Sequence, residues 1–349
     1  MSSSAGLAIE LVERGYMPDF VTRYGIRRRC RQRLRDEVRR APSDPLRARR
    51  EFADRMRGGP IAPVPECAND QHYELPAAFF QRVLGKYLKY SSGYWADGVT
   101  SLDQAEADGL RETCAHADLQ NGQDVLELGC GWGSLSLWMA EHYPASTITS
   151  VSNSNSQREF IMGQARDRGL TNLNVITKDM NDFEIDRQFD RIVSVEMFEH
   201  MRNYELLLQR ISNWLRPDGR LFVHIFCHRD YAYEFMQEGE DNWMGKYFFT
   251  GGIMPAEKIF DEFKDNLQVE EQWRWDGTHY QKTAEAWLEN MDAHRDEIRT
   301  VFADVYGDDV DRWISRWRVF FLACAELFGY DRGQEWFVTH ARLMRTDAS

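Results

Sequence analysis

The fold is decided by one stretch, Asp124-Val125-Leu126-Glu127-Leu128-Gly129-Cys130-Gly131-Trp132-Gly133, which places a buried-strand pattern directly before a glycine-rich turn. The apolar residues suit a central parallel strand, and the glycines end that strand sharply. Residues 134–142 follow with apolar side chains at helical spacing. A strand, a tight glycine turn and a helix bring backbone N–H groups to a place that a nucleoside-bearing ligand can approach, because no Cβ stands in the way. The stretch therefore predicts a ligand site on an α/β sheet.

The spacing of the glycines narrows the kind of ligand. The turn lacks the G-x-G-x-x-G register of dinucleotide sites, and no G-K-[ST] follows it, which excludes a P-loop. With Glu127 two residues before the first glycine, the pattern resembles motif I of class I S-adenosylmethionine-dependent methyltransferases. This resemblance implies that Glu127 handles the cationic methionine part of the ligand and that the glycines make room for its sugar. A plain turn without a ligand is the alternative, but glycines at this density cost backbone entropy and add no packing.

The rest of the chain alternates between strand and helix patterns, which is typical of an open parallel sheet. We expect strands at 124–128, 147–151, 173–176, 190–195, 220–226, 267–275 and 336–343. We expect helices at 134–142, 155–168, 203–215, 283–303 and 309–328, and a turn at Arg216-Pro217-Asp218-Gly219. The predicted fold is α/β: a class I methyltransferase (Rossmann-like), mostly parallel, seven-stranded sheet.

Two segments lie outside this alternation. Residues 5–57 look helical apart from an interruption at 41–45, and residues 58–65 read as a linker; helices at 75–89 and 104–118 follow, the second capped by Thr100 or Ser101. Residues 228–260 are long, aromatic and irregular for a connector, which favours a lid. We therefore predict an N-terminal helical extension or cap at 1–100 and a methyltransferase domain at 101–349, with a lid at about 228–260.

Composition excludes several classes of protein. A hydrophobic content of 43% over 349 residues supports a large core, but no stretch approaches the ~18 consecutive apolar residues of a membrane span. The N-terminus has no apolar signal core, and the six cysteines are scattered without a CxxC pair or metal-ligand spacing. These features predict a cytoplasmic protein with reduced thiols and no metal.

The charge of the chain is unevenly distributed. The net charge is −13, but residues 23–50 carry twelve arginines against three acids, so the remainder carries −22. An acidic body repels nucleic acid and anionic lipid, whereas the arginine-rich segment could attract either one. The alternative is a solvated helix whose arginines pair with the acidic body. We expect no nucleic-acid partner, and the sequence leaves a membrane contact and a homodimer open without favouring the membrane.

Polar residues follow the second and third predicted strands, where nucleoside-binding domains hold ribose and base. The usual ribose acid is missing after the second strand, so Asn153, Ser154 and Gln157 must serve. Asp179, beside Met180, offers a carboxylate where an adenine amino group usually finds its acceptor. For Asp179 the alternative is simple loop polarity.

Two carboxylates and an imidazole follow the fourth strand. Glu196, Glu199 and His200 stand just past its carboxyl end, where open α/β sheets bind ligands. Such a cluster could raise the imidazole pKa and orient the ring for proton transfer near neutral pH. A metal site would need a further ligand that the sequence does not supply, and a helix N-terminus decorated with acids is the structural alternative. His224 in the fifth strand and Tyr280 before a later helix are further candidates, each balanced against a role in the core.

Together these segments resemble the cyclopropane-fatty-acyl-phospholipid synthase superfamily, and within it the coclaurine- and pavine-type N-methyltransferases. The similarity runs through nearly the whole chain: the N-terminal Arg-rich helices, 90–95, 100–106, motif I, 152–157, 196–206, 227–228, 249–255, 280–287, 327–330 and 334–336. It also accounts for the missing ribose acid, since the family uses an Asn-Ser and Gln pattern there.

The resemblance implies S-adenosylmethionine as cofactor and a set of site residues. The expected cofactor contacts are Tyr90, Ser91, Glu127, Gly129, Cys130, Gly131, Asn153, Ser154, Gln157, Asp179, Met180 and Glu196. The expected catalytic set is Glu196, Glu199 and His200. The expected substrate contacts are Tyr94, His224, Phe248, Tyr280, Phe328, Tyr330 and Trp336.

The function implied is methyl transfer to the nitrogen of a small, aromatic or cyclic amine. A protonated amine has no lone pair, so His200, held by Glu196 and Glu199, would act as the base, and the rate would fall as His200 protonates. The alternative is a lipid enzyme that methylates or cyclopropanates acyl chains. His224 and Tyr280 match the pattern of those synthases, but Ser92 stands where they typically have a cysteine, which leaves the bicarbonate site in doubt.

Overall fold

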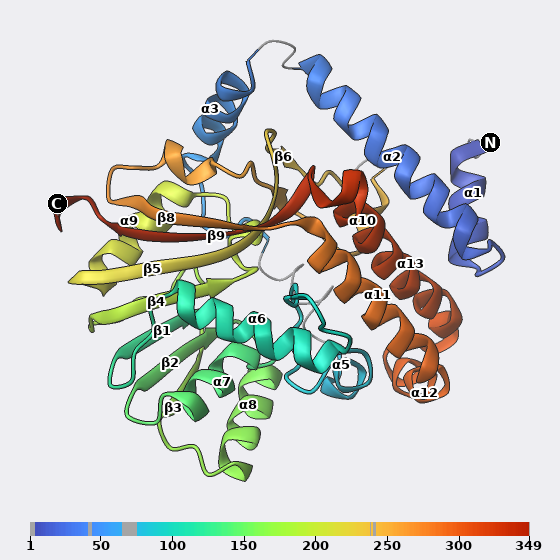
Figure 1. Ribbon diagram of the computed structural model, residues 1–349. Coiled ribbons are helices and arrows are strands. Elements are labelled where there is room, and N and C mark those ends of the chain that lie inside the picture. Colours follow the sequence, from blue (N-terminus) through green and yellow to red (C-terminus); the bar gives the residue numbers. More distant parts are fainter. Residues whose placement is uncertain (1–3, 41–43, 65–74, 238, 240–241, 349) are drawn as a thin grey trace.

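A seven-stranded sheet forms the centre of the molecule. The computed structural model describes residues 4–40, 44–64, 75–237, 239 and 242–348 (Figure 1). The strand order is β3-β2-β1-β4-β5-β9-β8. The strands are β1 (Asp124–Leu128), β2 (Thr147–Ser152), β3 (Leu173–Thr177), β4 (Phe189–Val195), β5 (Leu215–His228), β8 (Leu267–Trp275) and β9 (Trp336–Arg345). Only β9 runs antiparallel to its neighbours β5 and β8, which confirms the predicted mostly parallel sheet.

Helices cover both faces of the sheet because successive strand residues point to opposite sides. Helices α6 (Leu102–His116), α7 (Ser134–His142) and α8 (Asn155–Asp167) share one apolar core with Val125 and Val193. Helices α3 (Pro45–Met56) and α9 (Tyr204–Trp214) share the other with Leu126 and Ile192.

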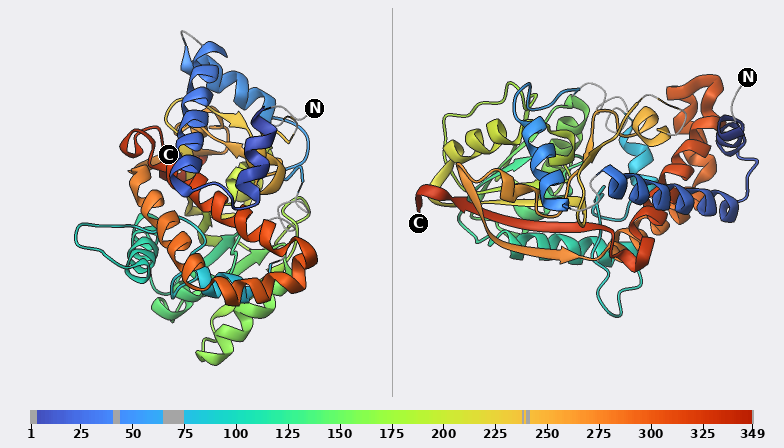
Figure 2. Two further views of the ribbon diagram at one scale, coloured as in Figure 1. Left: turned by 90° about the vertical axis from the view of Figure 1, so that its right-hand side faces the viewer. Right: turned by 90° about the horizontal axis from the view of Figure 1, so that it is seen from above.

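A helical layer lies beyond the carboxyl ends of the parallel strands. It contains α5 (Ala77–Val83), α11 (Gly277–Ala293), α12 (Arg295–Tyr306) and α13 (Val310–Phe328). The N-terminal helices α1 (Ser4–Glu13) and α2 (Asp19–Arg40) lie along α13 (Figure 2). Arg23 anchors α2 through a two-pronged ion pair with Glu285 at 2.6 Å and a contact with Glu326 at 2.9 Å. Part of the arginine-rich segment therefore pairs with the acidic body.

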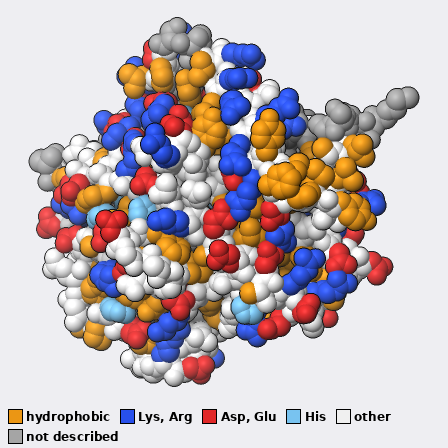
Figure 3. Space-filling view, turned by 45° about the vertical axis from the view of Figure 1, so that its right-hand side comes forward, with side chains coloured by type: hydrophobic (Ala, Val, Ile, Leu, Met, Phe, Trp, Pro, Cys, Tyr) orange, Lys and Arg blue, Asp and Glu red, His pale blue; other side chains and the backbone are white. Residues whose placement is uncertain are grey.

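The outer surface of these N-terminal helices mixes apolar and basic side chains. Figure 3 shows hydrophobic groups beside Lys and Arg on this side of the molecule. Within the described parts of α1, α2, α3 and their connections, the exposed large apolar residues are Leu7, Tyr16, Phe20, Tyr24, Val38 and Leu46. Among the described residues, no helix is both long and apolar enough to cross a membrane.

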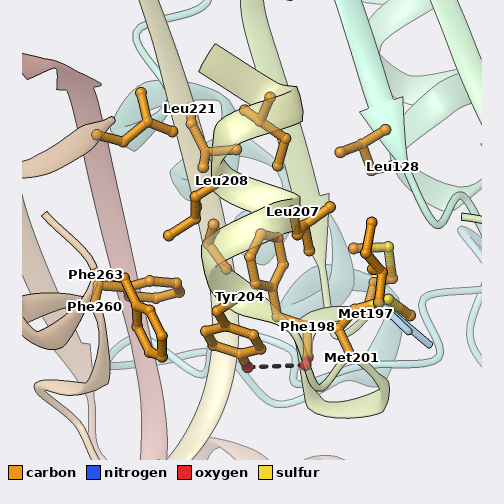
Figure 4. Packing of buried hydrophobic residues seen from close by; sticks show 14 of the residues in the cluster. Leu128, Met197, Phe198, Met201, Tyr204, Leu207, Leu208, Leu221, Phe260 and Phe263 are labelled. Carbon is orange, nitrogen blue, oxygen red and sulfur yellow. Dashed lines mark hydrogen bonds between the residues drawn. The ribbon is translucent and has the colours of Figure 1, made fainter. Parts of the chain in front are cut away.

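The core under α9 fixes the segment that follows β4. Tyr204 is fully buried, and its hydroxyl donates to the carbonyl oxygen of Phe198 at 2.9 Å (Figure 4). Phe260, in a single turn η3 (Ile259–Glu262), stacks on Tyr204 at 5.9 Å. Because η3 packs against Tyr204 of α9, and Tyr204 is hydrogen-bonded to Phe198, these contacts fix the 3-10 turn η2 (Phe198–His200) at the end of the sheet.

Several predicted boundaries were wrong, each for a local reason. The helix predicted over 75–89 ends at Val83, because Glu106 accepts the N–H groups of Gly85 and Tyr87 at 2.8 Å and so replaces the helical bonds. The single helix predicted over 283–303 is two helices that meet at His294, and the first begins at Gly277 because Asp276 caps it. The turn predicted at 216–219 lies inside β5, where the register with β4 shifts.

The segment predicted as a lid contains short elements. Strand β6 (Tyr233–Glu234) pairs with β7 (Ile253–Met254), and α10 (Trp243–Tyr247) stands between them. Residues 238 and 240–241 lie outside the described part, as do residues 41–43 of the predicted interruption, Pro65 of the predicted linker and Cys67. The cap of α6 is Ser101, whose hydroxyl accepts from the N–H of Gln104.

Candidate active site

A pocket of about 1210 Å³, part of it open to solvent, lies at the carboxyl ends of β1, β2 and β4. This is the edge at which open α/β sheets bind ligands. Ten of the twelve predicted cofactor contacts line it: Tyr90, Ser91, Glu127, Gly129, Cys130, Gly131, Asn153, Gln157, Met180 and Glu196. Ser154 and Asp179 do not. Ser154 caps α8, and Asp179 accepts the N–H of Asn181 at 2.6 Å.

The glycine turn shapes the floor of the pocket. Gly129 has φ of +80°, and a Cβ there would stand 2.8 Å from the Cβ of Met197. The N–H groups of Gly129 and Cys130 both donate to the carbonyl oxygen of Val151 at 3.0 Å, so they tie the turn to β2 and are not left for a ligand. A Cβ on Gly131 would meet no atom within 4 Å. The open space above Gly131 is therefore the part of the turn available to a ligand.

Glu127 presents a buried carboxyl to the same pocket. Its Oε2 accepts hydrogen bonds from the hydroxyls of Ser136 and Ser150, the second at 2.8 Å. Burial raises its pKa to about 7, against the effect of these two donors. A cationic ligand group would lower that pKa and be held by the carboxylate.

Four buried polar atoms in the pocket wall have no hydrogen-bond partner within the described residues. They are Nε2 of Gln157, Nε1 of Trp132 and the hydroxyls of Thr113 and Ser134. Gln157 is oriented by Ser152, whose hydroxyl donates to its Oε1 at 2.7 Å and leaves the amide N–H groups unused. Buried donors without partners are costly, so these atoms fit a polar ligand such as a nucleoside.

Glu196 receives bonds from three other segments. The N–H of Ser92 at 3.2 Å and Nε2 of His224 at 3.3 Å reach its Oε1, and the hydroxyl of Tyr280 donates to its Oε2 at 2.7 Å. Burial raises the pKa of Glu196 to about 7, although Lys89 and the Tyr280 hydroxyl act in the opposite direction. Glu196 is therefore a carboxyl that exchanges a proton near neutral pH.

Lys89 is a pocket residue that the sequence analysis missed. It is buried, and its ammonium donates to the hydroxyl of Ser91 at 2.5 Å and the carbonyl oxygen of Ser92 at 2.7 Å. Burial lowers its pKa to about 8. The sequence gives no sign of this role, because a lysine at the end of a predicted amphipathic helix is expected to be exposed.

The other two members of the predicted catalytic set differ from expectation. His200 lines the pocket, but burial lowers its pKa to about 4, so the prediction of a raised imidazole pKa was wrong. Glu199 does not line the pocket; it is fully buried, and its Oε1 accepts the N–H of Phe226 at 3.0 Å. Burial, followed by the nearby Glu196 carboxyl, raises the pKa of Glu199 well above its usual value. At neutral pH, His200 is therefore uncharged, and burial favours the protonated form of Glu199.

The predicted substrate contacts divide into two groups. His224 and Tyr280 meet at Glu196. None of the seven lines the described pocket. The remaining five belong to the aromatic core between the helical layer and the sheet: Tyr94, Phe248, Phe328, Tyr330 and Trp336. Of these, Phe328 is next to the site, because it stacks on Tyr280 at 4.2 Å.

Two aromatic residues that link His200 to Phe328 had not been predicted as contacts. Phe249 packs against His200 at 4.7 Å, and Phe226 lies between Phe249 at 5.6 Å and Phe328 at 6.0 Å. Aromatic contacts therefore run from His200 to Tyr280, whose hydroxyl meets Glu196. Phe226 could have been found from its place at the carboxyl end of the fifth predicted strand.

Comparison with known proteins agrees with this geometry. Residues 65–336 match the family described as mycolic acid cyclopropane synthetase. The chain belongs to this family. It is 36% identical to an (S)-coclaurine N-methyltransferase of Thalictrum flavum subsp. glaucum, over 95% of this chain and 93% of that one. It is 31% identical to the cyclopropane-fatty-acyl-phospholipid synthase of Escherichia coli K12, over 78% of this chain and 67% of that one.

Comparison with solved structures extends the match to the fold. A coclaurine N-methyltransferase bound to N-methylheliamine and SAH superposes with a TM-score of 0.94, at 34% identity over 98% of this chain and 100% of that one. The mycolic acid cyclopropane synthase CmaA1, in complex with SAH and CTAB, has a TM-score of 0.67 at 21% identity, over 81% of this chain and 99% of that one, and shares the fold. The protein is an S-adenosylmethionine-dependent methyltransferase, and the pocket residues fit that cofactor.

Proposed function

We propose that the protein transfers a methyl group from S-adenosylmethionine to the nitrogen of a small cyclic amine with an aromatic ring. The observation that carries this proposal is Glu196, a buried carboxyl with a raised pKa that faces the cofactor pocket among aromatic side chains. Relatives named as coclaurine and pavine N-methyltransferases match nearly the full chain at 36% and 33% identity, which supports a benzylisoquinoline-like acceptor.

Methyl transfer to an amine requires the residues around Glu196 to orient the amine and to remove its proton. When bound, S-adenosylmethionine supplies an electrophilic methyl group, so the chain must align an amine lone pair and remove the proton that blocks it. Ionised Glu196 can take that proton and can attract the cationic form of the amine. Tyr90 and Trp132, the aromatic residues that line the pocket, offer faces for the ring and the ammonium. His200, which stays neutral, can accept or donate a hydrogen bond to the same nitrogen.

The test is transfer of isotope-labelled methyl groups to a panel of amines that differ in one feature at a time. We expect 1,2,3,4-tetrahydroisoquinoline to be labelled, its tertiary N-methyl analogue to be labelled more slowly, and the isosteric carbocycle tetralin not at all. Equal labelling of open-chain aliphatic amines would contradict the aromatic acceptor. No labelled amine would contradict the proposal as a whole.

A lipid-modifying activity is a second candidate, and one observation favours it. His224 and Tyr280, the residues that match the lipid synthases, both bond Glu196. Ser92 weakens it, because its buried hydroxyl donates to the carbonyl oxygen of Gly93 at 3.0 Å and is used within the backbone. Labelling of unsaturated phospholipid vesicles that depends on added bicarbonate would support this candidate, and unlabelled vesicles would remove it.

We also propose roles for the segments around the site. Residues 1–100 act as a helical cap, and residues 228–260 as a lid, since Thr250 of that segment lines the pocket. Cytoplasmic location and homodimerisation are further proposals, and size-exclusion chromatography with light scattering decides the second.

A further inference from the structure

Four side chains form a continuous hydrogen-bonded row from the pocket to the surface. Nε2 of His224 lies 3.3 Å from Glu196, its Nδ1 lies 2.8 Å from Nε2 of His340, and Nδ1 of His340 lies 2.7 Å from Nδ1 of His116. Glu196 lines the pocket, and His224 and His340 are fully buried. The outer ring, His116, is 16% exposed, and its Nε2 lies 3.6 Å from the carboxylate of Glu112, which is 40% exposed. The row thus joins the reacting end of the pocket to solvent on another face.

The sheet itself builds this row. His224 on β5 and His340 on β9 are directly opposite in the antiparallel register, so their rings point to the same face. Glu196 follows Val195, which pairs with His224 across β4 and β5. His116 ends α6, the helix that covers this face, and it stacks on Trp273 of β8 at 4.1 Å.

The hydrogen bonds allow only two arrangements of protons. A neutral imidazole has one N–H and one lone pair, and both ring nitrogens of His224 and His340 are already in hydrogen bonds. Either every ring donates toward Glu196, or every ring donates toward His116. Switching from one arrangement to the other moves exactly one proton along the whole row, without any ring holding a charge at the end.

The surroundings keep these rings neutral. Burial is the main reason that the pKa of His116 falls to about 4. Burial also lowers the pKa values of His224 and His340 well below the usual value. Charged and titratable groups also face the row. Lys89, Tyr280 and His200 act on Glu196, and Lys89 also acts on His224 and His340. Arg342 and Glu112 are the groups near His116. Trp275 and Phe222 cover His340, at 4.3 and 4.9 Å. A metal does not explain the row, because the described residues contain no group of three His, Cys, Asp or Glu that could hold one.

We propose that His224, His340 and His116 carry the proton of the methylated nitrogen from Glu196 to solvent while ligands fill the pocket. The inference rests on the proposed N-methyltransferase function, since that reaction releases one proton for each methyl group added to an ammonium. His340 and His116 are positioning residues in this scheme, because they act through Glu196 and do not touch the substrate.

The step balances as follows. The acceptor ammonium gives a proton to the Glu196 carboxylate, which frees the nitrogen lone pair for the N–CH₃ bond. Glu196 passes this proton to Nε2 of His224, while Nδ1–H of His224 moves to His340, Nδ1–H of His340 moves to His116, and Nε2–H of His116 moves to Glu112 or water. Glu196 is a carboxylate again, and one proton has reached solvent. When the pocket opens, Nε2 of His116 takes up a proton from solvent, the reverse shift restores the rings and protonates Glu196, and Glu196 releases this second proton into the open pocket.

The test uses the outermost ring, whose replacement disturbs the core least. His116→Gln keeps a group that can hydrogen-bond His340 but cannot pass a proton on. We expect kcat for methylation of tetrahydroisoquinoline to fall about tenfold in dilute buffer, a modest share of the ~100-fold or larger effects of general acid–base groups, with KM and SAH affinity unchanged. In His116→Ala, added imidazole should restore kcat in a concentration-dependent way.

The matched control is His142→Gln. His142 is another histidine that ends a helix of the same face and stacks on a tryptophan, Trp138 at 3.9 Å, but lies outside the row. We expect wild-type kcat for this variant and no response to imidazole. Wild-type kcat in His116→Gln would overturn the relay, and so would a loss in His116→Ala that imidazole does not restore. If the wild-type enzyme labels no amine at all, the proposed function fails first, and the relay fails with it.

Discussion

Glu196 stands in the left-handed region of the backbone, with φ of 48°, directly after β4. A non-glycine residue in that region costs about 1–3 kcal/mol and persists only where the surroundings hold it. Here the N–H of Glu196 donates to the carbonyl oxygen of His224 at 2.9 Å, and its carboxyl accepts from Ser92 and Tyr280. The same contacts that hold the backbone also aim the carboxyl at the pocket. This agreement is the strongest sign at the residue scale that Glu196 is the centre of the site.

Replacement of Glu196 by glutamine tests this role. Glu196→Gln keeps the size and the hydrogen-bond acceptor but cannot take a proton from the amine. We expect kcat to fall by about 100-fold or more, the usual contribution of a general base, while SAH binding measured by calorimetry changes little. The control is Glu205→Gln, at a half-exposed glutamate in the first turn of α9, which should leave kcat unchanged. A Glu196→Gln enzyme with near wild-type kcat would contradict the assignment.

The pH dependence of kcat follows from two opposite pKa shifts. The pKa of Glu196 is raised to about 7 and that of His200 is lowered to about 4, in both cases mainly by burial. Ionised Glu196 is the form that accepts a proton, so kcat should fall as pH drops through about 7, whereas His200 remains neutral until about pH 4. The acid limb in a pH–rate profile should disappear in Glu196→Gln. A limb centred near pH 4 in the wild-type enzyme would instead assign it to His200, as the sequence had indicated.

At the scale of elements, two glycines in the strand–turn–helix unit at 124–142 have different roles, one in stability and one in ligand binding. A Cβ on Gly129 would meet Met197 at 2.8 Å, whereas a Cβ on Gly131 would meet only open space in the pocket. Both glycines have positive φ, so both substitutions carry a backbone cost of about 1 kcal/mol. The two variants therefore differ in what the added methyl group touches.

We expect Gly129→Ala to lower the melting temperature of the ligand-free protein more than Gly131→Ala does. Gly131→Ala should instead lose most of the rise in melting temperature that saturating SAH produces, because its methyl group occupies ligand space. Thermal unfolding with and without SAH measures both effects. A Gly131→Ala protein that SAH stabilises as well as the wild type would place the ligand elsewhere.

The sequence predicted the sheet well because the strands are short apolar runs between clear turns. It failed where distant residues compete with local bonds: Glu106, far along the chain, takes the backbone N–H groups that would have continued α5. Lys89 and the row of histidines were missed for the same reason, since pairing across strands and packing of α6 brings them together. The aromatic residues of the predicted substrate wall showed their apolar character in the sequence, but not whether they face the pocket or the core.

At the scale of the whole molecule, the N-terminal helices are fastened to the catalytic half by ion pairs. Arg23 bonds Glu285 and Glu326, and Arg318 of α13 bonds Asp19 at the start of α2. Glu326 is only 8% exposed, so removing its partner leaves a buried charge with weaker compensation. The cap is thus coupled to the helices that carry Tyr280.

Arg23→Ala should loosen α1 and α2 without unfolding the sheet. Loss of a two-pronged, partly buried ion pair costs about 2–4 kcal/mol, so limited proteolysis within α2 should become at least about tenfold faster. Arg35→Ala, at an exposed arginine of the same helix, is the control and should be cleaved at the wild-type rate. Equal rates for the two variants would show that the Arg23 contacts do not hold the cap.

The choice between an amine and a lipid acceptor is settled most directly by competition in one vessel. The enzyme is given S-adenosylmethionine with a trideuterated methyl group, together with tetrahydroisoquinoline and vesicles of unsaturated phospholipid, and mass spectrometry follows both acceptors. We predict a mass increase on the amine nitrogen that Glu196→Gln abolishes, and unlabelled lipid. Deuterium in the acyl chains with an unlabelled amine would contradict the account.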